Sequence, residues 1–221
     1  MQKNLKIALF GATGMIGSRI AAEAARRGHE VSAFARRPER VEHAAHVAAR
    51  QGDLFDVPAM MAAVVGHDVI ASAYAPPHDD ADKVVDAAQA LVAIARAAGI
   101  KRVVAVGGAG SLEVAPGKQL VDTEGFPAQY KAYALAHRDA LGFYRTANDI
   151  DWTFFAPAAI IAPGERKGTF RVGADKLIAD ENVNSTVSAK DYAIAFVDEI
   201  RVSRLLPLQC PLWLIAEMPR A

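Results

Sequence analysis

Cysteine is almost absent from this sequence: Cys210 is the only one in 221 residues. A single thiol can form no disulfide within the chain and no cysteine-rich zinc site, and such scarcity is typical of a reducing compartment. We therefore expect a cytoplasmic protein. An excess of charge of one sign is also missing, because 25 Lys and Arg residues balance 25 Asp and Glu residues. Without a net positive charge, the sequence favours neither nucleic acid nor an anionic membrane as a partner.

Long hydrophobic runs are missing as well. The first apolar run, residues 5–10, is too short for the core of a signal peptide, and no stretch reaches the roughly 18 apolar residues of a membrane span. Metal-ligand patterns are missing too, since His43 and His46 have no third ligand at a recognisable spacing. We expect a soluble protein without a metal site.

The residues that are present indicate one α/β domain. Hydrophobic residues make up 52% of the chain, and its length suffices for one core without disulfides, so we expect residues 1–221 to form a single domain. Short β-branched runs alternate with alanine-rich segments of helical period, which is typical of a doubly wound parallel sheet, the Rossmann fold. The predicted strands are residues 6–10, 30–35, 47–51, 68–73, 102–106 and 152–156.

Helix signals fall between these strands. The clearest helix is predicted over residues 82–98, with Gly99 past its end, and the first helix should end at Arg27 and Gly28. The last helix should begin at Ser188, where Asp191 three residues later completes a capping-box pattern. Doubly wound sheets bind ligands beyond the carboxyl ends of their strands, so the loops there should form the site.

Two longer segments break the alternation. Residues 107–129 form a long connection, and residues 157–188 contain glycines, prolines and short extended pieces that indicate a small C-terminal lobe. Both should face the substrate. A final strand is predicted at about residues 212–216, and the apolar tail from Leu205 could support a homodimer, so the state is predicted as monomer or homodimer.

A glycine turn between the first strand and the first helix predicts a phosphate site. Backbone N–H groups and the helix dipole hold phosphate at a helix start, and glycines keep side chains away from it. The turn follows the spacing G-x-x-G-x-x-G, a variant of the dinucleotide-binding fingerprint. It comprises Gly11, Ala12, Thr13, Gly14, Met15, Ile16 and Gly17.

The residues after the second strand predict which dinucleotide binds. NAD sites place a carboxylate there, whereas Arg36 and Arg37 suit the 2′-phosphate of NADP(H), which should be preferred over NAD(H). The alternative is a solvated basic turn that includes Arg40. After the third strand, Asp53 and Leu54 could contact the adenine, although Asp53 could equally cap a helix.

These motifs resemble the atypical short-chain dehydrogenases/reductases of the NmrA-like kind, the group of NADH-flavin reductases. The resemblance covers about residues 5–200 and is carried by the glycine turn and by residues 52–56, 106–112, 152–158 and 163–166. It implies NAD(P)H binding and reduction of a small-molecule acceptor. It also implies that Lys131 contacts the nicotinamide ribose, because Lys131 precedes Pro157 by the interval found in related reductases. Further predicted cofactor contacts are Ala73, Tyr74, Ala75, Gly107, Gly108, Pro157 and Ala158.

The catalytic pair of ordinary short-chain dehydrogenases, Tyr-x-x-x-Lys, is absent. Tyr130 is followed four residues later by Ala134, and Tyr133 by His137. The candidate catalytic residues are therefore Lys131, Tyr130 and Ser111. Ser111 could donate a hydrogen bond to a substrate carbonyl, or it could only satisfy backbone groups of its own loop. A Tyr133–His137 proton relay is an alternative to Lys131, although such a pair is more often packing.

Two functions remain open from the sequence. The first is an NADPH-dependent oxidoreductase that passes hydride to a flat acceptor such as a flavin or a quinone, because these acceptors need no obligatory protein acid. The second is a non-catalytic NADP-binding redox sensor of the NmrA type, which the missing Tyr-x-x-x-Lys keeps open. A ketone reductase or an epimerase is disfavoured by the same absence.

Overall fold

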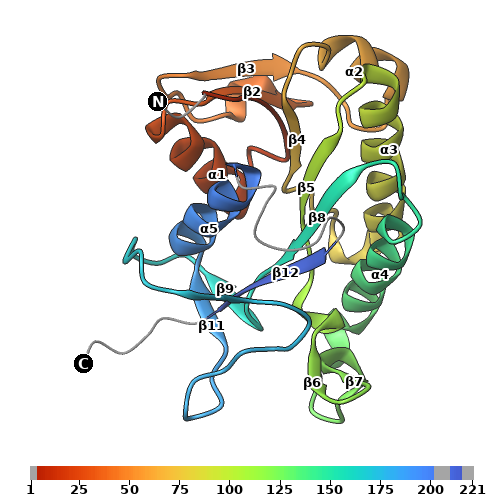
Figure 1. Cartoon of the computed structure of the whole chain (residues 1–221), viewed down its shortest axis with the longest axis vertical. Helices are drawn as coiled ribbons and strands as arrows, with labels where there is room; N and C mark the ends of the chain where they lie inside the picture. Colours follow the sequence, from red (N-terminus) through yellow and green to blue (C-terminus); the bar gives the residue numbers. More distant parts are fainter. Residues whose placement is uncertain (1–3, 202–209, 216–221) are drawn as a thin grey trace.

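The computed structural model describes residues 4–201 and the backbone of residues 210–215. An eight-stranded sheet lies between two layers of helices, α1 and α5 on one face and α2, α3 and α4 on the other (Figure 1). Neighbouring strands are parallel except β10, which pairs antiparallel with β12. The Rossmann fold class predicted from the sequence is thereby confirmed.

The order of strands across the sheet is that of a doubly wound fold, with β5 and β4 at its centre. From edge to edge the strands are β10 (Arg171–Gly173), β12 (Cys210–Ile215), β8 (Asp151–Ala156), β5 (Arg102–Val106), β4 (Val69–Ser72), β1 (Lys6–Phe10), β2 (Glu30–Ala35) and β3 (Val47–Gln51). The helices are α1 (Met15–Arg26), α2 (Val57–Ala63), α3 (Lys83–Ala98), α4 (Ala128–Tyr144) and α5 (Ala189–Arg201).

The continuous apolar run of β1 shows why the central strands have no polar face. Ile7 and Leu9 pack in the core beneath α1 and α5, whereas Ala8 and Phe10 pack in the core beneath α2, α3 and α4. Successive side chains of a strand point to opposite faces, and both faces are covered here. Helix α3 ends where Gly99 adopts a φ of +71°, as its position past the last apolar residue predicts.

Most predicted boundaries are confirmed to within one residue, and the last strand starts two residues early. Strand β12 covers Cys210–Ile215 rather than 212–216, and residue 216 lies outside the described residues. It adds to the sheet beside β8 because its backbone pairs with Thr153 to Ala156. Within the described residues, no helix is long and apolar enough to span a membrane.

The lobe predicted at residues 157–188 contains β9 (Ile160–Ala162), β10 and β11 (Thr186–Ser188). Strand β10 extends the main sheet, while β9 pairs in parallel with β11. The connection after β5 contains the hairpin of β6 (Glu113–Ala115) and β7 (Lys118–Gln119), which lies at the same end of the molecule as β9 and β11 (Figure 1). Two backbone hydrogen bonds join hairpin and lobe, from Glu113 to Asp175 and from Leu177 to Glu113.

A buried ion pair joins the last turn of α5 to the amino end of β5. The Arg102 guanidinium on β5 donates to the Glu199 carboxylate on α5, and Thr153 Oγ1 on β8 donates to the same carboxylate at 2.8 Å. Arg102 and Glu199 are each only 9% exposed. Burial raises the pKa of the Glu199 carboxyl, which the contacts with Thr153 and Arg102 oppose. A buried charge of this kind depends on its partner.

We expect the Glu199→Ala substitution to lower the free energy of unfolding by about 2 kcal/mol, because buried Arg102 would keep only its ion pair with Asp151 at 3.2 Å and buried Thr153 would lose its acceptor. Urea denaturation measures this change. Arg96→Ala, which breaks an exposed ion pair with Asp149, is the matched control and should change stability much less. Equal losses in the two variants would contradict the role given to burial.

Candidate functional site

The glycine turn connects β1 to α1, and two of its glycines are required by close packing. Gly11 has a φ of +80°, and a Cβ there would lie 2.5 Å from the backbone carbonyl of Ala73. A Cβ on Gly17 would lie 2.1 Å from the carbonyl oxygen of Gly11. Any side chain at either position would overlap backbone atoms, so these glycines bring strand, turn and helix together.

Gly14 differs from Gly11 and Gly17 because the fold leaves room for a side chain at this position. Its φ of −83° is open to any residue, and the nearest atom to a Cβ there would be the Gly11 oxygen at 3.5 Å. Gly14 lines a cavity and is the N-cap of α1, where it provides no side-chain cap, and the first turn holds no acidic residue. The positive end of the helix dipole therefore faces the cavity, which favours an anion.

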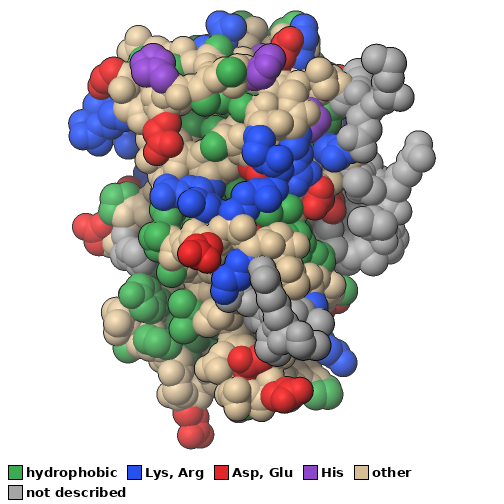
Figure 2. Space-filling model, turned by 90° about the vertical axis from the view of Figure 1, so that its left-hand side faces the viewer, with side chains coloured by type: hydrophobic (Ala, Val, Ile, Leu, Met, Phe, Trp, Pro, Cys, Tyr) green, Lys and Arg blue, Asp and Glu red, His purple; other side chains and the backbone are tan. Residues whose placement is uncertain are grey.

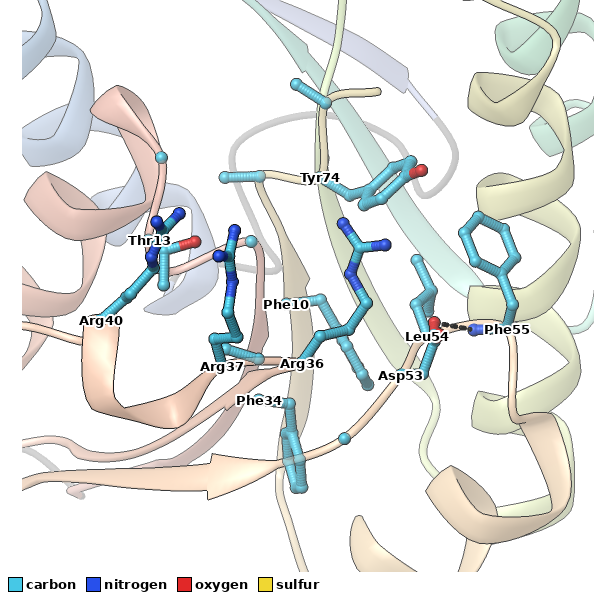
Figure 3. A pocket seen from close by; sticks show the side chains of 16 residues that line it. Phe10, Thr13, Phe34, Arg36, Arg37, Arg40, Asp53, Leu54, Phe55 and Tyr74 are labelled. Carbon is cyan, nitrogen blue, oxygen red and sulfur yellow. Dashed lines mark hydrogen bonds between the residues drawn. The ribbon is translucent and has the colours of Figure 1, made fainter. Parts of the chain in front are cut away.

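The cavity has a volume of about 210 Å³ and is formed by the loops that follow β1, β2, β3 and β4 (Figure 3). These are the carboxyl ends at which the fold predicts a ligand. Its lining contains ten of the predicted cofactor residues, namely Gly11, Thr13, Gly14, Arg36, Arg37, Asp53, Leu54, Ala73, Tyr74 and Ala75. Residues distant in sequence thus meet at one cavity.

Three guanidiniums face this cavity. Arg36, Arg37 and Arg40 all line it, and in Figure 3 their side chains rise on the same side of the β2 loop. None of them forms an ion pair or a side-chain hydrogen bond with a residue in the range 4–201. The concentration of positive charge suits a ligand with several negative charges.

The sequence pattern indicates Arg40 only as part of a solvated basic turn. The turn after β2 forms a short 3₁₀ helix, Pro38–Arg40, in which side chains three residues apart lie on one side. Arg40 therefore lies on the side of Arg37, and both line the cavity. A proline directly after Arg37 is the signal that could have predicted this turn.

Aromatic side chains form the other walls, and of these the sequence predicts only Tyr74. Phe10 and Phe34 stack with their ring centres 5.4 Å apart, and Phe55 meets Tyr74 edge to face at 5.4 Å. Both pairs line the cavity (Figure 3). Burial raises the pKa of the Tyr74 hydroxyl, while nearby Arg36 lowers it. These rings offer faces and edges to a planar heterocycle.

Asp53 does not cap a helix, which was the alternative open to it. Its Oδ1 accepts a hydrogen bond from the backbone N–H of Phe55 at 3.1 Å, and the cap of α2 is Asp56, whose Oδ1 accepts from Ala59 at 3.2 Å. Asp53 is left at the rim of the cavity with a second carboxylate oxygen that can accept hydrogen bonds.

The remaining predicted site residues lie outside this cavity. Met15, Ile16 and Gly17 form the first turn of α1, and Gly107 and Gly108 follow β5. Pro157 and Ala158 follow β8. Gly107 lies against the Phe154 ring, because a Cβ there would come within 2.5 Å of it.

The candidate catalytic residues are also not gathered in the cavity. Lys131 and Tyr130 are exposed in the first turn of α4. Ser111 is buried, and its Oγ donates to the Gly108 carbonyl at 3.1 Å. This contact is the backbone role that the sequence left open for Ser111, so its hydroxyl hydrogen is already used within the loop.

The Tyr133–His137 pair on α4 is a packing contact in this structure. The two rings meet at 4.8 Å, and His137 also packs against Gly108 and Phe154. Burial lowers the pKa of His137 to about 4, and burial also raises the pKa of Tyr133 to about 12. A neutral imidazole cannot supply the positive charge by which lysine lowers the pKa of a catalytic tyrosine, so the relay is not supported.

We expect the Gly14→Ala substitution to leave the free energy of unfolding within about 1 kcal/mol of wild type and to weaken NADP⁺ binding at least about tenfold. The backbone accepts the methyl group, but the methyl group occupies the space in front of the helix start. Urea denaturation and calorimetric titration measure the two effects.

Gly17→Ala is the control, because its Cβ would overlap the Gly11 oxygen and should destabilise the fold by at least about 2 kcal/mol. Unchanged NADP⁺ affinity in Gly14→Ala would contradict a phosphate at this turn.

Comparison with known proteins agrees with the geometry. The NAD(P)H-binding family matches residues 11–201. A crystal structure of a candidate exported protein from Burkholderia pseudomallei is 63% identical, covers 96% of this chain and 100% of that one, and has a TM-score of 0.89. The uncharacterised protein YwnB of Bacillus subtilis (strain 168) is 36% identical over 89% of this chain and 92% of its own.

A third relative is described as a candidate NADH-flavin reductase, from Streptococcus pneumoniae TIGR4. Its crystal structure is 30% identical, covers 97% of this chain and 100% of that one, and has a TM-score of 0.86. The resemblance read from the sequence motifs is confirmed by these matches. A glycine turn, a doubly wound sheet and a family match over most of the sequence lead to one conclusion: this chain belongs to the NAD(P)H-binding family.

Proposed function

We propose that this protein is an NADPH-dependent oxidoreductase that transfers hydride to a flat acceptor such as a flavin or a quinone. The observation that carries the cofactor preference is the group of three guanidiniums at the cavity, those of Arg36, Arg37 and Arg40. NADPH differs from NADH by one phosphate on the adenosine ribose, and unpaired guanidiniums beside the cavity favour that extra charge. A carboxylate there would favour NADH instead.

The remaining cavity features fit the other parts of the dinucleotide. The diphosphate would lie at the start of α1, before Gly14, where the helix dipole faces the cavity. The adenosine would lie between the arginines and the rings of Phe55 and Tyr74, with Asp53 at its edge. The nicotinamide would then extend toward Gly107, Gly108, Pro157 and Ala158, which follow β5 and β8.

A flat apolar acceptor is supported by the side chains exposed at the same end of the sheet. Several large apolar residues there are at least 37% exposed, among them Met15, Val114, Tyr130, Ile160 and Val172. They belong to α1, α4, the β6–β7 hairpin and the lobe, which all follow carboxyl ends of strands. Apolar side chains exposed together around a ligand site favour an apolar ligand.

The chemistry demands little of the protein. The bound cofactor supplies the hydride, and a flavin or a quinone takes its proton from solvent, so no protein acid is obligatory. This agrees with the missing Tyr-x-x-x-Lys pair and with a Ser111 hydroxyl engaged by Gly108. The name of the Streptococcus pneumoniae relative supports a flavin acceptor. Cytoplasmic location and a monomeric or homodimeric state remain predictions from the sequence.

We expect the Arg36→Asp substitution to weaken NADPH binding ten- to a hundredfold, as loss of a charge-assisted hydrogen bond does, and to leave NADH binding nearly unchanged. Calorimetric titration of both cofactors gives the ratio of affinities. Arg50→Asp is the matched control, because it makes the same charge change on exposed β3, where Arg50 donates to Ser32 rather than lining the cavity. An equal change in the ratio of NADPH to NADH affinity in both variants would indicate a long-range electrostatic effect instead of a contact with the phosphate.

We also expect wild-type protein to oxidise NADPH with FMN or menadione as acceptor. The loss of absorbance of the reduced nicotinamide measures this reaction. Lys131→Ala should slow this turnover more than it weakens NADPH binding, because the proposed role of Lys131 is to orient the nicotinamide ribose. Tight NADPH binding without turnover of any acceptor would instead favour the redox sensor. An unchanged rate in Lys131→Ala would exclude Lys131 from the site.

A further inference from the structure

Helix α5 forms only half of the capping box that its sequence predicts. The expected first half is present, because Ser188 Oγ accepts a hydrogen bond from the Asp191 N–H at 3.0 Å. In a complete capping box, the acidic side chain would return to the N–H of the capping serine. Here Asp191 Oδ1 accepts hydrogen bonds from the N–H groups of Lys167 at 2.9 Å and Gly168 at 2.8 Å. A fully buried carboxylate of α5 therefore holds the lobe.

The serine of the cap holds the same segment. Ser188 Oγ donates to the Glu165 carbonyl at 2.7 Å. Gly164 approaches Ser188 so closely that a Cβ on Gly164 would lie 2.8 Å from the Cβ of Ser188. Residues 163–168, which we name the tether segment, therefore lie directly on the first turn of α5.

A second anchor joins the tether segment to α1. Arg166 donates two hydrogen bonds to the two oxygens of Glu23, both at 3.2 Å, and Glu23 is only 6% exposed. Arg26 and Arg27 donate to the same carboxylate. Burial raises the pKa of Glu23, but the bonds from Arg26, Arg166 and Arg27 outweigh burial and lower it to about 2. Glu23 therefore stays charged at every pH at which the protein is expected to work.

The surface over α1 and α5 carries many charged side chains. On the side that carries α1 and α5, Lys and Arg side chains form a band across the middle of the molecule, with acidic side chains beside it (Figure 2). The Arg26 and Arg166 side chains are 55% and 42% exposed, so either can be replaced without opening a cavity in the core.

The tether segment connects β9 to β10 within the lobe, and the lobe follows the carboxyl end of β8. Backbone bonds from Glu113 and Leu177 also join the lobe to the hairpin after β5. The lobe thus spans the carboxyl ends of β5 and β8, the side proposed for the nicotinamide. Its two anchors lie on α5 and on α1, and the start of α1 is the proposed diphosphate site.

We propose that Asp191 and Arg166 are positioning residues that hold the lobe at a fixed place relative to the cofactor. The lobe then places the acceptor against the nicotinamide ring in the orientation that hydride transfer requires. This inference rests on the proposed function. Because α1 carries both the diphosphate site and Glu23, one rigid helix sets the distance between cofactor and lobe. Small displacements of a reacting group reduce the rate strongly, so the anchors should act on the acceptor and spare the cofactor.

The exposed anchor gives the sharper test. Arg166→Ala should lower kcat with menadione about tenfold and leave the Kd for NADPH within about twofold of wild type. Arg26→Ala is the matched control, because it also removes two hydrogen bonds from Glu23 but leaves the lobe attached. Equal kcat values in the two variants, or a Kd for NADPH that rises as kcat falls, would overturn the proposal.

The buried anchor is tested by amide hydrogen exchange followed by NMR, which requires no acceptor. Asp191→Ala should increase exchange at Lys167 and Gly168 at least about tenfold, whereas Asp191→Asn should retain slow exchange because its amide oxygen can still accept both bonds. Unchanged exchange in Asp191→Ala would overturn the role of this anchor. If wild-type protein oxidises NADPH with neither menadione nor FMN, the proposed function fails, and exchange at these amides then decides the tether by itself.

Discussion

The close approach of two backbone segments at Gly11 and Gly17 is the constraint on which the rest of this structure depends. A Cβ at either position would overlap backbone atoms at 2.5 Å or less, so only glycine lets β1, its turn and α1 come together with the helix start aimed into the cavity. Gly14 is different, because the fold would accept a side chain there. In the proposed function, its small size leaves room for the diphosphate. Packing and the proposed phosphate binding thus use separate glycines of one motif.

Charge is distributed in two distinct ways. Two ion pairs, Arg102 with Glu199 and Arg166 with Glu23, join elements distant in sequence. Arg36, Arg37 and Arg40 have no acidic partner in residues 4–201 and all line one cavity. These three arginines are exposed, so it is their gathering at one cavity, beside the carboxyl ends of the strands, that points to an anionic ligand. This contrast separates the basic residues of the fold from those of the proposed cofactor site.

The proposed cofactor and acceptor sides are built differently. The cavity for the adenosine and phosphates is formed by short loops after β1 to β4, fixed by the sheet itself. The acceptor side is formed by the β6–β7 hairpin and the lobe, which are held to one another by backbone bonds and to α1 and α5 by Arg166 and Asp191. Longer segments need such anchors, because the sheet alone does not fix their position.

The sequence by itself determined the Rossmann fold, the strand boundaries and the glycine turn that we propose holds phosphate, because these depend on local periodicity and on glycine spacing within about 10 residues. It also indicated Arg36 and Arg37 by their place after the second strand. Only the tertiary structure decided that Arg40 joins them, that Phe55 meets Tyr74, and that burial keeps His137 neutral. It also decided that Asp191 bonds to Lys167 and Gly168 instead of closing its own capping box. Each of these depends on contacts between segments distant in sequence, which no local pattern records.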